Sequence, residues 1–216
     1  MLVCTVLRAS GVGSFASPAP ARQGCAVNAA DFILGELPPP PARVLEVGCG
    51  TGELATELAA SGYDVLAVDP DAPDGPIFRR TTIEELEEPG PFEAVVASRS
   101  LHHVGELDTA LDRIVSLLWP DGVFILDEFA WERLDARSAR EVGIDLQEWR
   151  EEHEDLHTST SMLTALEARF EQRSFSWEPY LHRESRQAVD EDAERRLIDS
   201  GRLAATGFRY VGVRRG

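Results

Sequence analysis

The chain has 216 residues, of which 43% are hydrophobic, and this suits one globular domain with a sizeable core. Its formal net charge of -17 argues against a nucleic-acid backbone or an anionic membrane as the main partner, because both require a basic surface. This charge favours a small-molecule substrate. Cys4, Cys25 and Cys49 form no C-x-x-C pair, so we expect a protein of the reducing cytoplasm. No apolar run approaches the roughly 20 residues that span a bilayer.

The first residues do not match a secretory signal, because their apolar part is short and is broken by Gly11 and Gly13. We expect residues 1–25 to be a flexible tail or to precede the true start of the protein, which would then lie near Val27. Residues 26–216 are expected to form a single domain.

Strands and helices alternate through the first part of that domain. A short amphipathic helix over residues 27–37 is stopped by the proline run Pro38 to Pro41, and further helices are expected over 53–62 and from 106 to a stop at Pro120. Buried strands are expected at residues 42–47, 64–68, 76–80, 92–98 and 123–129. Such alternation predicts an α/β fold with a mostly parallel sheet and helices on both of its faces.

The second part of the chain has a different pattern. Residues 133–157 are charged and helical, residues 161–170 form an amphipathic helix, and residues 171–181 resemble a strand. A charged helix over 189–201 and a last strand over 206–215 complete the chain.

Three glycines mark the turn from the first strand into the first following helix. Gly48, Gly50 and Gly52 let the backbone approach a ligand closely, and the free N–H groups of a helix start favour an anionic group. Asp69 follows the second strand, where a carboxylate can accept hydrogen bonds from both hydroxyls of a ribose. The NAD-type pattern G-x-G-x-x-G fails, because its third glycine would have to be Glu53.

The pattern is instead E-x-G-x-G-x-G, with Glu46 two residues before Gly48. It resembles motif I of the class I methyltransferases that use S-adenosylmethionine, and "DVLAVDPD" resembles their second motif. "ASRSLHHV" and "LLWPDGVFILDE" resemble later motifs of small-molecule methyltransferases related to the ubiquinone and menaquinone biosynthesis enzymes. The resemblance implies a Rossmann-like seven-stranded sheet whose last strand is antiparallel, a cofactor-binding core over about residues 26–128, and a helical cap.

The resemblance also implies which residues bind the cofactor S-adenosyl-L-methionine. Glu46 would lie near its ammonium group, and Asp69 with Pro70 would hold the ribose and adenine side. The remaining positions that match the family are Gly48, Cys49, Gly50, Gly52, Thr82, Ile83, Ser98 and Arg99.

A methylsulfonium group is already activated, so the protein mainly has to align the nucleophile, the methyl group and the sulfur. A base is needed only when the nucleophile arrives protonated. His103, at the carboxyl edge of the sheet, is the first candidate for that base, and His157 in the cap is the second. A packing role for His103 beneath the cofactor is the alternative.

The cap is expected over residues 129–160 and 180–205. Its aromatic and imidazole groups suit a mostly apolar pocket with a few polar anchors, although a solvated helix face is the alternative. Together with His102 at the sheet edge, the candidate substrate-pocket residues are His153, Trp131, Trp149, Tyr180 and His182.

Two other functions compete with methyl transfer. His153, Glu154 and His157 spell H-E-x-x-H, which on one helix face could hold zinc in a metallohydrolase. A non-catalytic cofactor-binding module is the other alternative.

The sequence after the fourth strand narrows the reaction. It lacks the D/N/S-P-P-Y/F pattern associated with methylation of nucleobase or glutamine nitrogens, and it lacks the acidic metal ligands of magnesium-dependent relatives. We therefore expect metal-free methylation of a small organic molecule, at oxygen first and with nitrogen or carbon open.

Overall fold

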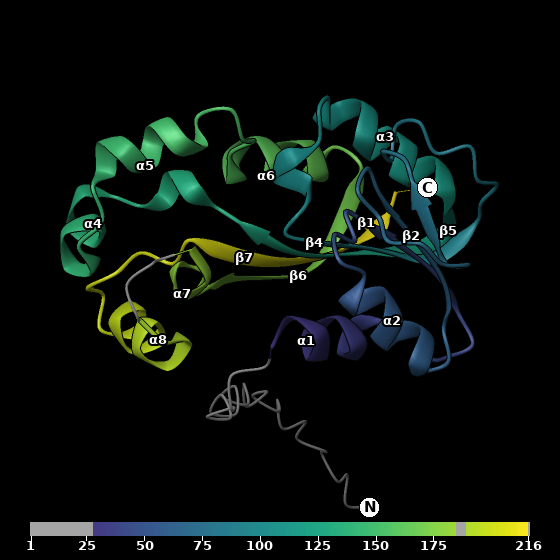
Figure 1. Cartoon of the computed structure of the whole chain (residues 1–216), viewed down its shortest axis with the longest axis horizontal. Helices are drawn as coiled ribbons and strands as arrows, with labels where there is room; N and C mark the ends of the chain where they lie inside the picture. Colours follow the sequence, from purple (N-terminus) through teal and green to yellow (C-terminus); the bar gives the residue numbers. More distant parts are fainter. Residues whose placement is uncertain (1–27, 185–188, 216) are drawn as a thin grey trace, which may run out of the picture.

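The computed structural model describes residues 28–184 and 189–215, so the expectations for residues 1–25 lie outside the described residues. The fold is one sheet with helices around it (Figure 1). Its strands are β1 Arg43–Val47, β2 Asp64–Asp69, β3 Phe78–Arg80, β4 Phe92–Ser98, β5 Leu118–Phe129, β6 Phe170–Glu178 and β7 Gly207–Arg214. The α-helices are α1 Ala29–Glu36, α2 Glu53–Ala60, α3 Leu107–Leu117, α4 Ala136–Val142, α5 Leu146–His153, α6 Ser159–Glu167, α7 Leu181–Glu184 and α8 Glu191–Asp199, and the short 3₁₀ helices are η1 Leu101–His103 and η2 Trp131–Arg133.

The seven strands lie in the order β3-β2-β1-β4-β5-β7-β6. Neighbours from β3 to β5 are parallel, whereas β7 runs antiparallel to both β5 and β6. The predicted fold class, including the antiparallel last strand, is therefore confirmed. The strand order reverses between β1 and β4, which is the place where ligands bind in open α/β sheets.

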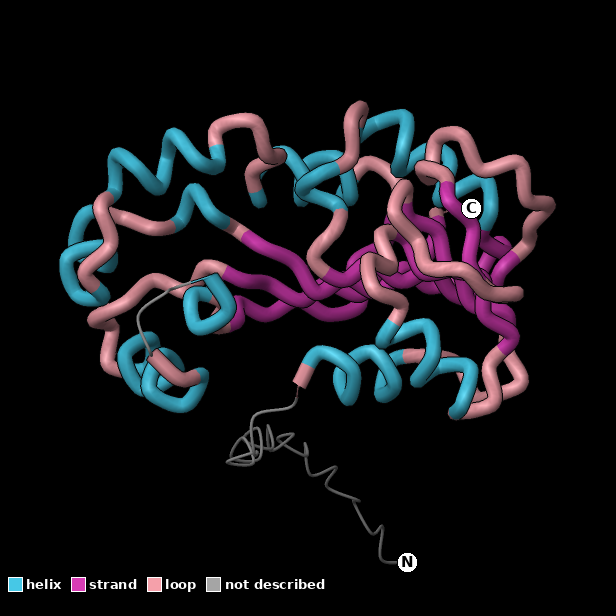
Figure 2. The backbone as a smooth tube through the Cα atoms, viewed as in Figure 1, coloured by secondary structure: helices cyan, strands magenta, loops and turns pink. Residues whose placement is uncertain are grey.

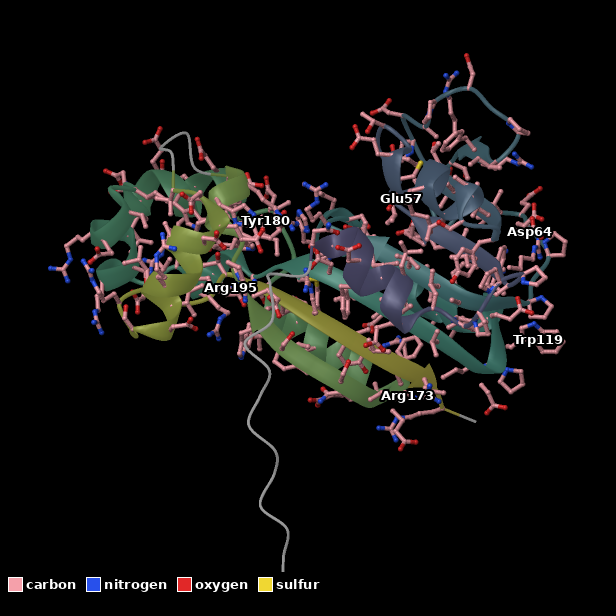
Figure 3. All side chains as sticks on the ribbon, turned by 90° about the horizontal axis from the view of Figure 1, so that it is seen from below. Glu57, Asp64, Trp119, Arg173, Tyr180 and Arg195 are labelled. Atoms are coloured by element: carbon pink, nitrogen blue, oxygen red, sulfur yellow. The ribbon has the colours of Figure 1, made fainter. Side chains whose placement is uncertain are left out.

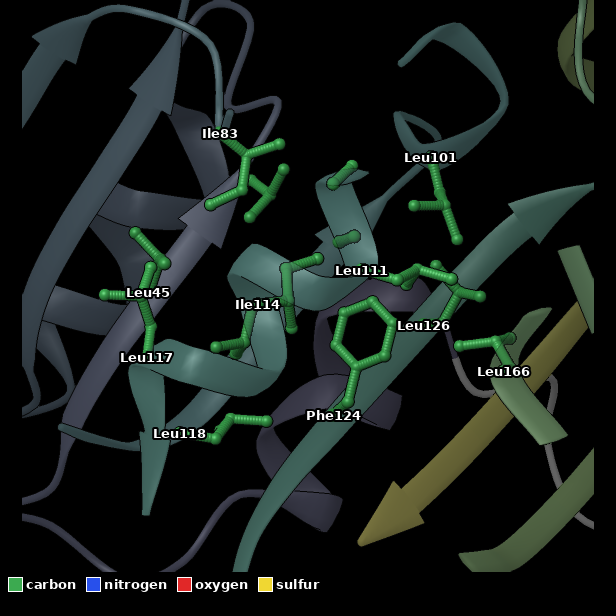
Figure 4. Close-up of a cluster of buried hydrophobic side chains, with 14 of the residues drawn as sticks. Leu45, Ile83, Leu101, Leu111, Ile114, Leu117, Leu118, Phe124, Leu126 and Leu166 are labelled. Atoms are coloured by element: carbon green, nitrogen blue, oxygen red, sulfur yellow. The ribbon is translucent and has the colours of Figure 1, made fainter. Parts of the chain in front are cut away.

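Helices cover both faces of the sheet, with α1 and α2 on one face and α3 and α6 on the other (Figures 1 and 2). Successive side chains of a strand point to opposite faces, so Val44 joins the α1–α2 side while Leu45 joins the α3–α6 side. On the α3–α6 side, Leu45, Ile114 and Phe124 belong to one continuous apolar cluster (Figure 4). This two-sided burial fixes the carboxyl ends of β1, β2 and β4 as a rigid edge.

A third apolar cluster lies beyond the end of the sheet. It joins Phe129 at the end of β5 to residues between positions 131 and 149 and to residues between positions 180 and 203, including Trp149, Tyr180 and Leu203. The two segments expected to form the cap therefore pack against one another, although they are far apart in the sequence.

Element boundaries differ from the expectations in two places. The helix expected to continue to Pro120 ends earlier, at Leu117. Residues from Leu118 onward belong to β5, because Leu118 pairs with Phe92 of β4 across an irregular register. The charged stretch 133–157 divides at Gly143, whose positive φ of 71° ends α4.

The expectation that His153 and His157 share one face of a helix is wrong. Helix α5 ends at His153, so the two imidazoles do not lie one turn apart on one helix. Within the described ranges 28–184 and 189–215, no helix is long and apolar enough to cross a membrane.

Candidate functional site

A cavity of about 640 Å³ opens at the carboxyl ends of β1, β2 and β4, where the strand order reverses. Its volume falls within the range of small-molecule sites, roughly 300–1,000 Å³. The wall is formed by α1, the β1–α2 turn and α2, the loops after β2, β3 and β4, and two residues at α7: Tyr180 just before this helix and Glu184 at its end. The lining residues are Ala29, Ala30, Ile33, Glu46, Val47, Gly48, Cys49, Gly50, Thr51, Glu53, Leu54, Glu57, Val68, Asp69, Pro70, Thr81, Thr82, Ile83, Glu84, Ser98, Arg99, Ser100, His103, Val104, Gly105, Tyr180 and Glu184.

The glycines of the β1–α2 turn serve different purposes. Gly48 has a φ of +73°, and a Cβ atom there would lie 2.2 Å from the Cβ of Ser100, so only glycine fits. Gly50 has a φ of +50° with open space where its Cβ would point, and Gly50 lines the cavity. Gly52 does not line the cavity; it precedes α2, where a Cβ would collide with Phe78.

Asp69 at the end of β2 is held by the backbone of the turn. Its two carboxylate oxygens accept hydrogen bonds from the amides of Gly50 at 2.9 Å and Asp71 at 2.8 Å. A carboxylate has about four acceptor positions, so Asp69 can still accept hydrogen bonds from a ligand. The arrangement ties the position of Asp69 to the glycine turn.

Glu46 at the base of the cavity is the most perturbed carboxyl group there. It is 3% exposed, and its Oε2 atom has no hydrogen-bond partner. Burial raises the pKa of Glu46 to about 7 and the nearby Asp69 adds to the rise, while a hydrogen bond with the backbone of Ala55 opposes it. A buried carboxylate with a free acceptor oxygen suits a cationic ligand group such as an ammonium.

Cys49, beside Glu46 in the wall, is not a nucleophile. Burial, followed by the negative charges of Glu46 and Asp69, raises the pKa of its thiol to about 12. The thiol therefore stays protonated near neutral pH.

The loop after β4 is fastened by Glu128 of β5. The buried Glu128 carboxylate accepts the amides of Ser100 at 3.2 Å, Leu101 at 2.8 Å and Phe129 at 2.7 Å. It also forms a short hydrogen bond with Nδ1 of His102. The contacts with Ser100, Leu101 and His102 fix η1, which carries the neighbouring His103.

His103 lines the cavity and keeps an exposed side chain. Partial burial lowers its pKa from the ordinary value of 6.5, and the adjacent His102 ring, 4.1 Å away between centroids, adds to this effect. Glu128 and Glu184 oppose the shift, and His153 supports it. The imidazole is therefore neutral at pH 7 and able to accept a proton.

Tyr180 and Glu184 form the wall nearest the cap, together with Arg99 of the β4 loop. The Tyr180 ring stacks on Phe129, with centroids 4.3 Å apart. Arg99 has a φ of +57°, an uncommon backbone conformation for a side chain of its size.

The cavity brings together all but one of the predicted cofactor-binding residues, the exception being Gly52, along with His103 and Tyr180. The other predicted residues lie elsewhere. His102 is buried against Glu128, and the His182 Nδ1 atom lies 2.8 Å from a carboxylate oxygen of Glu194. His157 bonds the carbonyl oxygen of Val104 through Nε2 at 2.9 Å.

The remaining three candidates, His153, Trp131 and Trp149, pack against other aromatic rings. His153 lies among the rings of Trp149, Trp131 and Phe129, with centroid distances of 4.2, 6.2 and 5.4 Å. Its Nδ1 atom is 2.6 Å from the carbonyl oxygen of Trp149, and the indole nitrogen of Trp149 donates to the Trp131 carbonyl. These residues pack against one another and against Phe129, and they do not line the cavity.

Sequence reasoning missed several residues of the site. Glu128 could have been found, because it is a carboxylate at the carboxyl end of a buried strand. Glu57 and Glu184 gave no comparable signal, since their stretches resemble solvated helix faces. Among the residues that the structure describes, no three His, Cys, Asp or Glu side chains are grouped as metal ligands would be.

Comparisons with known proteins agree with this geometry. A family model described as a methyltransferase domain matches residues 13–178, so the chain belongs to that family. The predicted resemblance to the class I S-adenosylmethionine-dependent methyltransferases is confirmed. At the level of the family, the expected enzyme class and the expected cofactor are confirmed as well.

One curated relative is the ubiquinone biosynthesis O-methyltransferase of Xylella fastidiosa, 35% identical over 108 residues that cover 43% of this chain and 44% of the relative. The chain thus spans less than half the length of this relative. A solved S-adenosylmethionine-dependent methyltransferase from Mesorhizobium loti shares the fold, with a TM-score of 0.58, 19% identity, and coverage of 87% of this chain and 98% of that one. A [4+2]-cyclase also shares it, with a TM-score of 0.53, 17% identity, and coverage of 86% and 79%.

Proposed function

We propose that this protein transfers a methyl group from S-adenosylmethionine to a small organic molecule, with oxygen as the first-choice acceptor atom and nitrogen or carbon open. The observation that carries the proposal is Glu46, a buried carboxylate with a free oxygen in the same cavity as Asp69. The two acidic groups suit the ammonium and ribose ends of one ligand, and the glycine turn lies between them. The bound cofactor would supply an electrophilic methyl group.

The residues of the chain provide binding, alignment and one proton acceptor. Glu46 would bind the ammonium group, and Asp69 the ribose hydroxyls, while Thr82, Ile83 and Pro70 line the adenine side. His103, held by the η1 loop and neutral at pH 7, would take the proton of a hydroxyl nucleophile. The name of the Xylella relative, an O-methyltransferase, supports oxygen as the acceptor.

We also propose the organisation of the chain around this site. Residues 26–216 would act as one domain, with a core over 26–128 and a cap over 129–160 and 180–205 that encloses the acceptor. The common apolar cluster of the two cap segments supports this division. The cytoplasm, with a small molecule as partner, is the proposed setting.

Binding of S-adenosylhomocysteine, measured by calorimetry, tests the cofactor site. Asp69→Ala should weaken binding roughly 10- to 100-fold, because it removes charge-assisted hydrogen bonds worth about 1.5–3 kcal/mol. Asp71→Ala, which removes an exposed carboxylate from the same loop, is the matched control and should bind normally. Unchanged affinity in Asp69→Ala would refute the ribose assignment.

Methyl transfer needs a separate measurement, because the [4+2]-cyclase shows that the fold alone does not fix the reaction. Radiolabelled S-adenosylmethionine with a panel of phenols, catechols and amines should yield a labelled product, and His103→Asn should lower the rate for hydroxyl acceptors by roughly 10²- to 10⁴-fold. Tight binding of S-adenosylhomocysteine without transfer to any member of the panel would favour the non-catalytic module.

A further inference from the structure

Glu194 of α8 is fully buried, at 0% exposure, and does not line the cavity. Its carboxylate accepts the backbone amides of Tyr180 at 2.7 Å, Leu181 at 2.9 Å and His182 at 2.8 Å. It also lies 2.8 Å from Nδ1 of His182. One carboxylate on a neighbouring helix therefore satisfies the free N–H groups at the start of α7.

The same arrangement occurs on the other side of the site. Glu128 accepts the amides at the start of η1 and bonds His102 in that helix, as Glu194 does for α7 and His182. Each short helix carries a residue that lines the cavity: His103 ends η1, and Glu184 ends α7. Two buried glutamates thus place two walls of one cavity.

Helix α7 depends on the Glu194 carboxylate because the helix has only four residues, too few to be stable without tertiary contacts. A second tie joins Arg183 Nη1 to Asp127 Oδ2 of β5 at 3.2 Å. Tyr180, immediately before α7, stacks on Phe129, which contacts the His102 ring at a centroid distance of 5.7 Å. Contacts therefore run without interruption from α8 through Tyr180 and Phe129 to η1. Figure 3 shows Tyr180 in the part of the molecule that holds α7 and α8.

We propose that Glu194 is a positioning residue for the acceptor side of the cavity, where it holds Tyr180 and Glu184 in the same wall region as His103. The label "acceptor side" rests on the proposed function, whereas the positioning itself does not.

The proton affinity of His103 reports the position of Glu184. The groups whose charges act on the pKa of His103 are His102, Glu128, Glu184 and His153, and the negative charge of Glu184 raises this pKa. If Glu194→Gln releases α7, Glu184 moves away and the pKa of His103 falls below its value in the unmodified chain. Histidine NMR titration of the whole protein measures this, with His103→Asn identifying the signal.

Three companion variants separate movement of Glu184 from loss of charge. Glu184→Gln should lower the pKa of His103, and the double variant with Glu194→Gln should lower it no further. Asp192→Asn removes an exposed carboxylate from the same helix and should leave the titration unchanged. An unchanged pKa in Glu194→Gln, or additive shifts in the double variant, would overturn the proposal.

Glu194→Asp keeps the charge but withdraws the carboxylate by one methylene, so it tests the same point if the glutamine variant does not fold. Its His103 pKa should also fall, and an unchanged value counts against the proposal. The affinity for S-adenosylhomocysteine should stay within about twofold in either variant, because Glu46 and Asp69 are on other elements. A loss as large as that of Asp69→Ala would mean that Glu194 merely supports the fold. No binding by the unmodified chain would instead refute the proposed function and leave the titration result standing.

Discussion

Buried carboxylates in this protein are of two kinds. Glu128 and Glu194 are saturated by hydrogen bonds and hold short helices in place. Glu46 is equally buried, yet one oxygen has no partner. A buried charge without partners destabilises a fold, so its presence in a cavity is more typical of a binding site than of a structural element.

Glu46→Gln should stabilise the ligand-free protein at pH 8. The folded-state pKa of Glu46, about 7, lies above the ordinary value of 4.5, so its ionisation destabilises the fold as the pH rises through this window. Removing the charge should add up to about 3 kcal/mol to the free energy of unfolding at pH 8 and little near pH 4.5. Denaturant titrations at several pH values measure the difference.

The same variant should bind S-adenosylhomocysteine less tightly, because it cannot pair with an ammonium group. In the unmodified chain the affinity should fall as the pH drops below 7 and Glu46 becomes protonated, and in Glu46→Gln this dependence should be lost. Glu171→Gln, at an exposed position of β6, is the control. Equal pH profiles in the two variants would contradict the assignment.

At the scale of elements, the end of α5 decides the meaning of the H-E-x-x-H pattern. The helix stops at His153, and beyond it His157 donates its backbone N–H to the carbonyl of His102. The ring of His157 is directed to the carbonyl of Val104. His157 therefore connects the segment after α5 to η1 through hydrogen bonds, and the rings of His153 and His157 have separate protein partners.

We expect zinc to have no specific effect on this segment. One equivalent of zinc should leave the melting temperature unchanged, and His157→Ala should retain no less metal than the unmodified chain after dialysis, measured by atomic emission. The variant should lose about 1 kcal/mol of stability with its hydrogen bond. One tightly bound zinc ion that disappears in His157→Ala would revive the hydrolase.

At the scale of the whole molecule, negative charge dominates, with a formal net charge of -17. The described residues that line the cavity are also mainly acidic. They include one arginine, Arg99, and the carboxylates of Glu46, Glu53, Glu57, Asp69, Glu84 and Glu184. The resulting field favours cationic ligands.

Salt should therefore weaken binding of S-adenosylmethionine more than binding of S-adenosylhomocysteine, which lacks the sulfonium charge. Between about 0.05 M and 0.5 M sodium chloride, screening shortens from roughly 14 Å to 4 Å and should separate the two affinities by several-fold. Calorimetry at matched pH measures both. Identical salt dependence would show that the carboxylates do not act on the ligand.

The sequence by itself determined the core of this protein. The alternation of buried strands and amphipathic helices is a local pattern, and the spacing of Glu46, the glycines and Asp69 follows directly from where those strands end. The expectation of a mostly parallel sheet with helices on both faces therefore came from local patterns, whereas the antiparallel last strand and the cofactor came only from the resemblance to a known family.

Only the tertiary structure decided which side chains form the wall of the cavity next to α7. Whether His153, His157 or His182 faces a cavity depends on hydrogen bonds to residues distant in the sequence, such as Val104 and Glu194. No periodicity encodes those partners, because a histidine packed in a core and one lining a pocket can occupy the same pattern. Burial and long-range hydrogen bonding, which only the folded chain creates, placed His103, Tyr180 and Glu184 around one cavity.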